Sequence, residues 1–567
     1  MVAVASERRG EIALARGALD CAFLTAIVGI SVLPYIHGLG FYYDDYAVLG
    51  DMNAAPHHSL WGLYDAVRPA TGQRPLQAFI FALLYRVFGL HPLGYHVVNA
   101  CLLVGVAILL YLVLRELRLP RLLCVTLPLI YSTLPHYATN RFWLNGFEIN
   151  LSTLFYLVSL YAGLRALRAR LLPFVAWLAV AVACVAGSLF AYEVVFPLFA
   201  LNVALLVWAA RGASEMVPMA HRLTIGCVSG AILVVGALKT TLVAEHGQNT
   251  YTIGVQNGLA HHLAYLVSGS IKVNVGTYFL AVPYVLWWIV RHRFSAGDGG
   301  TAAAAGLLAS VYVLRLARTE SHARDDARLW RNSAGIGVVV FVLGYAIFLT
   351  NQRVLFRSAG IDNRVNAAAA LGVAAVIAGG LGWIGTRVSA RRLAGFLSAS
   401  VGCAVAVGVL IVGALGGFWR TAAKDQHTIV SSLRQIQPSL PRSSTVVLDE
   451  VCPEAGPAVV FADQWDFRNA LRLEYGDTSL IGDTATDALQ AGRRRLRLTM
   501  VFLGTRSTRT YEYGPRLFVY DFSRRVLHPI RDRKDALRYL DTRTQLDCLP
   551  QRGFAWGFNP FSRTSLP

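Results

Sequence analysis

Two adjacent carboxylates, Asp44 and Asp45, follow closely on an apolar run that covers residues 18–35. The run is long enough to cross a bilayer, so the pair lies where a membrane span ends. Charge at that boundary is costly unless it faces water, a cation or a reacting group. A carboxylate there can accept the proton of an attacking hydroxyl. The competing interpretation is a hydrated loop whose aromatic residues form an interfacial belt.

Other ionisable residues that adjoin predicted spans gather on the same side of the membrane as the acidic pair. They combine carboxylates with guanidiniums, which suits a substrate carrying a phosphate and an attacking or leaving hydroxyl, because Arg binds phosphate oxygens in a bidentate manner. For any single cation, the alternative role is contact with a lipid headgroup. Arg74 and Arg364 are the candidates for a donor phosphate. The full set of predicted binding residues is Arg74, His136, Glu148, Glu193, Arg357 and Arg364.

These residues need a scaffold in the membrane, and the composition indicates one. The chain has 567 residues, of which 55% are hydrophobic and 15% charged. Its mean hydropathy is +0.48. Because apolar runs of span length recur, we expect a polytopic α-helical membrane protein. The net charge of +19 comes mostly from arginine clusters between apolar runs, which is typical of cytoplasmic loops and argues against nucleic acid as a partner.

About eleven spans are predicted, with the N-terminus inside and the C-terminus outside. Basic clusters at alternate ends of the apolar runs set this orientation. The first outer loop covers residues 36–92, and its apolar part 76–88 is too short to span and is expected in the interface. Residues 301–317 have basic residues on both sides, so we expect them in the cytoplasmic layer. The predicted spans are 18–35, 93–114, 122–134, 150–167, 172–190, 196–210, 223–243, 275–290, 334–349, 367–384 and 393–418.

The hydropathy changes after residue 418. Short β-branched or aromatic runs then alternate with helical stretches, which predicts a small soluble α/β domain at 421–567 behind a transmembrane catalytic domain at 1–420. The expected strands are 444–448, 458–461, 498–503 and 516–520, and the expected helices are 465–475 and 534–540. On the outer side of the membrane, Cys452 and Cys548 can form a disulfide; two unrelated thiols are the alternative.

The membrane part resembles a known family. An acidic pair in a long first outer loop, the stretches 73–76 and 88–99, and a following span with a basic end resemble the GT-C superfamily of polyprenyl-phosphate-sugar-dependent glycosyltransferases. Protein O-mannosyltransferases and the lipid A aminoarabinose transferase belong to that superfamily. The resemblance covers residues 10–420 and is strongest over 36–200.

The resemblance implies an inverting transfer of a sugar from a polyprenyl-phosphate donor to an acceptor hydroxyl. It maps the catalytic base onto Asp44 or Asp45, and two further acidic positions onto Glu148 and Glu193. Tyr192 stands where the family commonly has Lys, which weakens Glu193 as a marker of the phosphate site. Some members use a divalent metal and others do not, and two carboxylates are too few to identify a metal site. No other cofactor is expected.

The implied partners are the polyprenyl-phosphate-linked sugar, a glycan, lipid or protein acceptor, and membrane lipids. The implied location is the bacterial inner membrane, with the active site and the C-terminal domain extracytoplasmic. Two other functions compete with the enzyme. A lipid-linked-sugar flippase or transporter would line its path with the same charges, and repeated halves with broken helices would favour it. A polymerase or ligase of the O-antigen type would use similar donors without an acidic pair after the first span.

Overall fold

The structure is a computed structural model of the chain. It describes residues 2–211, 218–246, 258–350, 354–388, 390–485, 488–502, 505–544 and 546. The helices of the membrane part are α1 (Val2–Ile36), α2 (Asp44–Asn53), α3 (Leu60–Thr71), α4 (Pro75–Phe88), α5 (Pro92–Glu116), α6 (Arg121–Thr133), η1 (Pro135–Tyr137), α7 (Thr139–Phe142), η2 (Leu144–Gly146), α8 (Phe147–Ala166), α9 (Leu171–Ala191), η3 (Phe196–Leu198), α10 (Phe199–Arg211), α11 (Pro218–His246), α12 (Leu259–Ile271), η5 (Lys272–Leu280), α13 (Val282–His292), α14 (Ala296–Thr319), α15 (Ser321–Asp325), α16 (Ala327–Ala346), η6 (Ile347–Thr350), η7 (Ile361–Asn366), α17 (Ala367–Gly385) and α18 (Ala390–Ile436).

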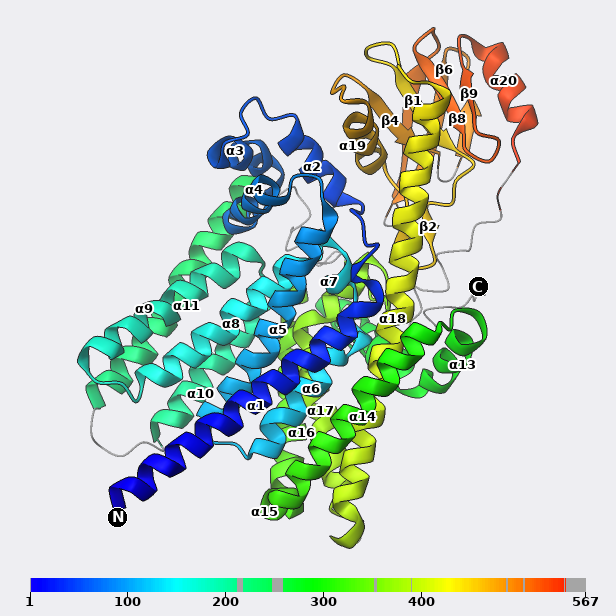
Figure 1. The fold of residues 1–567 in the computed structure, drawn as a ribbon. Coiled ribbons are helices and arrows are strands. Elements are labelled where there is room, and N and C mark those ends of the chain that lie inside the picture. Colours follow the sequence, from blue (N-terminus) through cyan, green and yellow to red (C-terminus); the bar gives the residue numbers. More distant parts are fainter. Residues whose placement is uncertain are drawn as a thin grey trace.

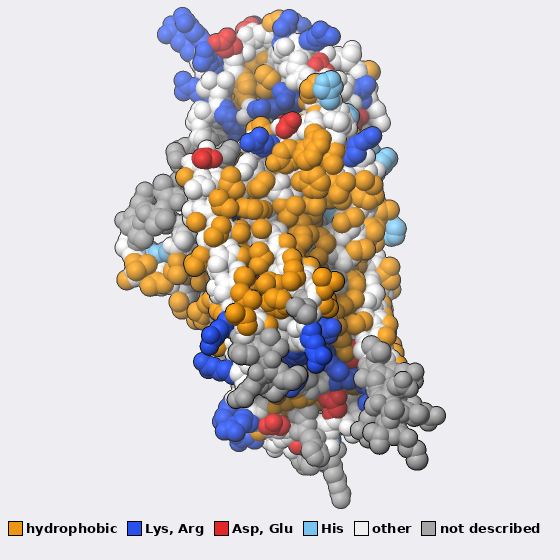
Figure 2. Space-filling model, turned by 90° about the vertical axis from the view of Figure 1, so that its left-hand side faces the viewer, with side chains coloured by type: hydrophobic (Ala, Val, Ile, Leu, Met, Phe, Trp, Pro, Cys, Tyr) orange, Lys and Arg blue, Asp and Glu red, His pale blue; other side chains and the backbone are white. Residues whose placement is uncertain are grey.

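The helices form a bundle with an apolar belt. Figure 2 shows hydrophobic side chains over the middle of one face, with Lys and Arg toward both ends. Within the described ranges, nine helices are long and apolar enough to cross a membrane. The chain is therefore an integral membrane protein, as its composition predicts. The C-terminal domain stands at one end of the bundle, called here the domain end, and the N-terminus lies at the opposite end (Figure 1).

One predicted span and one predicted surface segment exchange roles. Helix α14, which contains the 301–317 stretch, is long and apolar enough to span. It packs along α18 through small residues: a Cβ on Gly306 would lie 2.8 Å from the Gly402 carbonyl oxygen, and Ser310 and Ser398 exchange hydrogen bonds of 3.1 and 3.0 Å. Small residues let membrane helices approach closely. The expectation that 301–317 stays in the cytoplasmic layer is therefore wrong.

The predicted span 275–290 instead belongs to a broken helix. The segments Leu259–Leu280 and Val282–His292 meet at a bend of 62°. The Arg293 guanidinium that follows lies 4.3 Å over the Phe418 ring, and Phe418 packs at Gly456 of the C-terminal domain. The broken helix thus ends at the domain end, and α14 makes the crossing. Because one crossing helix replaces another, the C-terminal domain still lies on the opposite side from the N-terminus, as predicted.

The C-terminal domain is the small α/β domain that the sequence predicts. Strand β1 pairs in parallel with β4 and β8, and β9 extends this sheet in antiparallel fashion. A second, antiparallel sheet has the order β5-β6-β7. The elements are β1 (Thr445–Asp449), β2 (Glu454–Ala455), β3 (Ala458–Val459), α19 (Gln464–Tyr475), β4 (Ile481–Thr484), β5 (Ala488–Ala491), β6 (Arg495–Phe502), β7 (Thr505–Glu512), β8 (Leu517–Asp521), β9 (Val526–Pro529) and α20 (Arg533–Thr542).

Two further expectations concern the join and the cysteines. The division at residue 420 stays a prediction, because α18 runs without a break from Ala390 to Ile436 and carries the chain out of the bundle into the domain. Cys452 is disulfide-bonded. Its expected partner Cys548 lies outside the described residues.

Candidate active site

The acidic pair is held at the domain end by the loop between α1 and α2. Gly40 lies so close to α18 that a Cβ would come within 2.9 Å of the Ala423 side chain. The Tyr42 hydroxyl donates to the Trp419 carbonyl of α18 at 2.8 Å. Tyr43 then takes a φ of 51°, an uncommon backbone angle for a residue with a side chain, and turns the chain into α2. The first turn of α2 therefore carries both carboxylates at a fixed place.

The two carboxylates have different surroundings, and Asp45 is enclosed. Its side chain is 0% exposed. Its Oδ2 accepts from the backbone N–H groups of Tyr42 at 2.9 Å and Leu144 at 3.3 Å. Its Oδ1 accepts from the backbone and side-chain N–H groups of Asn145 at 3.0 and 2.8 Å. Burial raises the pKa of Asp45 to about 7, although the hydrogen bonds from Tyr42 and Asn145 act to lower it. Asp45 thus joins α2 to η2.

Asp44 faces the charged groups at the domain end. Its Oδ1 accepts one hydrogen bond, from the indole Nε1 of Trp465 at 3.0 Å. Burial raises the pKa of Asp44 above its usual range, while the charge of Arg364 and the Trp465 hydrogen bond oppose that rise. Arg74 also acts on this pKa through its charge. Asp44 is therefore a carboxylate near two guanidiniums, with no other side-chain hydrogen bond among the described residues.

An ion-pair network lies beside Asp44 and joins α4, α8, α9 and α11. Arg74 contacts Glu193 in a bidentate manner, at 2.6 Å through Nη2 and 3.1 Å through Nε. Lys239 Nζ lies 3.1 Å from Glu193 Oε2, the oxygen that also accepts from Arg74 Nε. Burial would raise the pKa of Glu193, but Arg74 and Lys239 outweigh it and hold that pKa well below its usual range. Glu193 thus fixes two cations at the domain end.

The network extends to Glu148 and to the Tyr192 ring. Glu148 lies in the first turn of α8 and is 2% exposed, and its Oε1 lies 3.9 Å from Arg74 Nη1. Its Oε2 has no hydrogen-bond partner in the described part of the chain. The Arg74 guanidinium stacks 4.1 Å over the ring of Tyr192. The Tyr192 ring therefore supports Arg74, and Lys239 of α11 brings an ammonium group to the Glu193 carboxylate.

Arg364 reaches the site from η7, at the start of α17. Its guanidinium lies 5.0 Å over the Trp143 ring, and the Trp143 indole donates to the Tyr42 carbonyl at 3.0 Å. The platform under Arg364 is thus tied to the same loop that presents Asp44. A guanidinium over an aromatic face gains a favourable interaction when desolvated.

The remaining predicted residues, His136 and Arg357, make their described contacts with other groups. His136 is buried, with its ring 4.6 Å from that of Tyr278, and burial lowers its pKa to about 3, so the ring is neutral. Arg357 pairs with Asp362 at 3.3 Å and lies near Glu454 of the C-terminal domain, whose pKa burial raises to about 7. Arg357 therefore belongs to a second charged group between the bundle and that domain.

Sequence reasoning missed Trp465. It counted Lys239 among the ionisable residues on the same side as the acidic pair, with a lipid contact as the alternative, and did not name it as a binding residue. Trp465 is 421 positions from its acceptor Asp44, so no local pattern links the two. The one usable signal was chemical, because a half-buried indole N–H needs an acceptor. In the part of the chain that the structure describes, no group of three or more His, Cys, Asp or Glu side chains could hold a metal ion, so we name no metal ligands.

The comparisons with known proteins give structural matches only. No protein-family model and no curated protein matches the sequence. A solved structure of ArnT from Cupriavidus metallidurans bound to undecaprenyl phosphate is similar at 12% identity and a TM-score of 0.36, over 81% of this chain and 85% of that one. The Archaeoglobus fulgidus oligosaccharyltransferase tethered to an acceptor peptide is similar at 13% identity and a TM-score of 0.37, over 82% and 64%. The matches include the aminoarabinose transferase named in the sequence resemblance, and likeness at this level assigns no activity to the chain.

Proposed function

We propose that the protein is an inverting glycosyltransferase that moves a sugar from a polyprenyl-phosphate donor to an acceptor hydroxyl. The observation that carries the proposal is the pair of contrasting carboxylates: Asp45 has all its oxygens engaged, whereas Asp44 makes one hydrogen bond and lies near Arg364 and Arg74. A carboxylate next to phosphate-binding cations is what a single displacement at a sugar phosphate needs.

In the proposed step, Asp44 accepts the proton of the acceptor hydroxyl as its oxygen forms a bond to the anomeric carbon. The bond from that carbon to the phosphate oxygen breaks, and its electron pair leaves with the lipid phosphate. Attack from the face opposite the phosphate inverts the anomeric centre. Arg364 stabilises the charge that develops on the leaving phosphate, since a guanidinium binds phosphate oxygens in a bidentate manner. Arg74, whose bidentate contact is with Glu193, adds its positive charge beside the phosphate.

The raised pKa of Asp44 supports a role as a base. A carboxylate of ordinary pKa is a weak base near neutral pH, and burial increases its affinity for the proton. Arg364 and Trp465 oppose the rise, because a positive charge and a donated hydrogen bond both favour the ionised carboxylate.

We propose that the domain end faces the outside of the bacterial inner membrane. At the opposite end, the described arginines include Arg115, Arg118, Arg165 and Arg168, beside the ends of α5 and α8. Basic residues at span ends mark the cytoplasmic side. The active site, the C-terminal domain and the acceptor then lie in the extracytoplasmic space, as does the disulfide of Cys452, which an oxidising compartment favours.

The proposal is tested with purified protein and a panel of polyprenyl-phosphate sugars. Asp44→Asn should lower turnover about a hundredfold or more with wild-type folding, the usual scale for removing a positioned base. Arg165→Ala serves as the matched control because its pair with Glu116 lies at the opposite end of the bundle. Wild-type turnover in Asp44→Asn would refute the assignment. Movement of lipid-linked sugar across vesicle membranes, without transfer, would favour the transporter instead.

A further inference from the structure

The C-terminal domain contributes a side chain to the candidate active site. Trp465, on the first turn of α19, donates its indole N–H to Asp44 Oδ1 at 3.0 Å. Its ring also meets that of Tyr43 at 5.3 Å and 63°. Among the described residues this is the single hydrogen bond on the Asp44 side chain, so the orientation of that carboxylate depends on a residue outside the membrane bundle.

Trp465 is itself held firmly. Asp463 caps α19 by accepting from the Gln464 backbone N–H at 2.8 Å, and a reciprocal contact from Asp466 completes a capping box. Asp463 is in turn bound by Arg509 of β7 at 2.8 Å. A capping box satisfies two free N–H groups at a helix start. The first turn of α19, which carries the indole, is therefore tied to the sheet of its own domain.

The same helix packs on the element that carries Asp44. A Cβ on Gly50 of α2 would lie 2.5 Å from the Asn469 side chain of α19. Asn469 also donates to the Trp465 carbonyl at 2.9 Å. Because no side chain larger than Gly fits at position 50 without a shift, α2 and α19 keep one separation, and the indole meets the carboxylate at a defined place.

We propose that Trp465 is a positioning residue that holds Oδ1 of Asp44 and leaves Oδ2 to accept the proton of the acceptor hydroxyl. The inference rests on the proposed function. It makes the C-terminal domain a required part of the active site, because the bundle by itself leaves the carboxylate free to rotate. A hydrogen bond to a charged group also favours the ionised form that a base needs.

The test is Trp465→Phe, which keeps an aromatic ring and removes the N–H. We expect kcat to fall about ten- to a hundredfold, the usual scale for a hydrogen bond to a charged group, with little change in KM for donor or acceptor. The acid limb of the kcat/KM profile should move to higher pH, because losing the hydrogen bond raises the pKa of Asp44. Adding Trp465→Phe to Asp44→Asn should have no further effect, since the indole acts through that carboxylate.

Arg472→Ala is the matched control, because it removes a contact of α19 within its own domain, the hydrogen bond to the Leu480 carbonyl at 2.8 Å, and leaves both Trp465 and the α2–α19 contact in place. It should leave the pH profile unmoved, and if Trp465→Phe destabilises the fold, this control separates a loss of stability from the lost hydrogen bond to Asp44. A wild-type kcat and pH profile in Trp465→Phe would overturn the inference while leaving the proposed function intact. Wild-type turnover in Asp44→Asn would instead overturn the proposed function.

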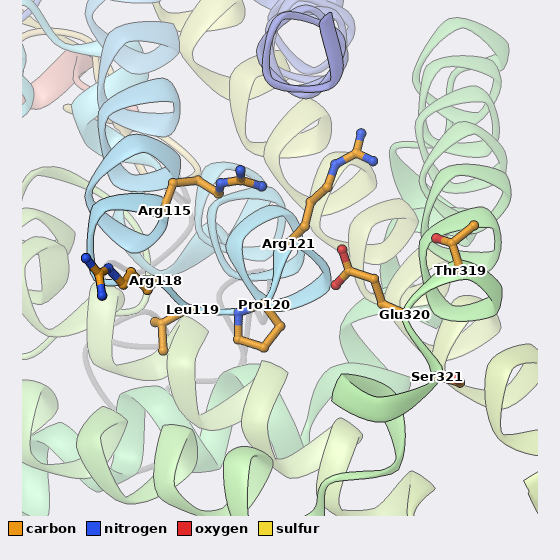
Figure 3. Close-up of a pocket in the computed structure, with 8 residues that line it drawn as sticks. All are labelled: Arg115, Arg118, Leu119, Pro120, Arg121, Thr319, Glu320 and Ser321. Carbon is orange, nitrogen blue, oxygen red and sulfur yellow. The ribbon is translucent and has the colours of Figure 1, made fainter. Parts of the chain in front are cut away.

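A basic cavity at the opposite end of the bundle supports a separate proposal. The cavity measures about 580 Å³ and lies where α5 meets α6 and α14 ends (Figure 3). Two of its charged residues are already engaged: Arg121 binds Asp20 at 2.7 and 2.8 Å, and Glu320 accepts from the Leu122 backbone N–H at 3.0 Å. Arg115 and Arg118 are exposed, with no ion-pair partner among the described residues.

We infer that this cavity binds the phosphate of an anionic phospholipid. Helix α5 is apolar along its length and ends at Glu116, so the cavity lies at the level where lipid headgroups meet the protein. Basic pockets between membrane helices at this level are suited to phosphate headgroups. The Asp20 carboxylate is 0% exposed and also accepts from Tyr111 and Tyr312, so it holds Arg121 in place. Arg115 and Arg118 then bring two positive charges to the cavity against the single negative charge of Glu320.

Native mass spectrometry of the whole protein with phosphatidylglycerol or phosphatidylcholine tests this inference. Wild-type protein should retain phosphatidylglycerol preferentially, and the Arg115→Ala/Arg118→Ala variant should lose most of that preference. Arg165→Ala is the control, because this exposed arginine is paired with Glu116 at the same end. Equal retention in the double variant would overturn the inference. If inorganic phosphate fully displaced the bound lipid and the protein showed no preference between the two lipids, the cavity would be assigned to a soluble anion and the lipid inference would be overturned.

Discussion

Replacing Asp45 by Asn should lower the stability of the fold more than it lowers the rate of transfer. The Asp45 carboxylate is buried and accepts four N–H groups, two on each oxygen. An Asn amide keeps one oxygen and presents an NH2 group to the other two donors, which are then buried without an acceptor. Each such donor costs about 1–3 kcal/mol, so we expect a loss of roughly 2–6 kcal/mol in the free energy of unfolding.

Asp44→Asn is the matched comparison. Its remaining side-chain oxygen can still accept from Trp465, so the unfolding temperature should change little while turnover falls. Thermal unfolding in detergent, followed by intrinsic fluorescence, measures the first quantity, and single-turnover transfer measures the second. If Asp45→Asn unfolds at the wild-type temperature while Asp44→Asn is strongly destabilised, the distinction between the two carboxylates is refuted.

Three further outcomes follow from the site and the topology. Glu193→Gln should unfold at a lower temperature than wild type at pH 7. The difference in unfolding temperature should shrink as pH falls below about 4.3, the ordinary Glu pKa, because the stability that a lowered pKa contributes is lost when the carboxylate is protonated. A constant difference down to pH 3 would contradict the ion pairs of Glu193. Arg364→Lys should lower turnover roughly tenfold, since an ammonium cannot reproduce a planar guanidinium stacked on Trp143; steady-state kinetics with wild-type values would exclude a phosphate role. In a background without exposed cysteines, a cysteine at position 293 should react with a membrane-impermeant maleimide in intact cells and one at position 315 should not; the reverse would restore the predicted span 275–290.

The sequence by itself determined the class of the protein and predicted the position of a candidate site. Apolar runs of span length predict membrane helices wherever they occur, because unpaired backbone groups cannot be left in hydrocarbon. The pattern after residue 418 likewise predicts the strands and helices of the small domain, since β-branched runs and turn residues act locally. The adjacent carboxylates and Arg74, Glu148, Glu193 and Arg364 were identified because ionisable residues at span ends are rare and costly.

The tertiary structure decided which groups meet. Asp44 and Asp45 are neighbours of the same type, and only the surrounding N–H groups and charges distinguish them. From the sequence, the basic residues on both sides of 301–317 favoured a place in the cytoplasmic layer. In the fold, Gly306 and Ser310 fit closely against α18, and α14 is a crossing helix. Trp465 reaches Asp44 through the packing of α19 on α2. Contacts between residues hundreds of positions apart depend on how whole elements pack, and that information is absent from any local pattern.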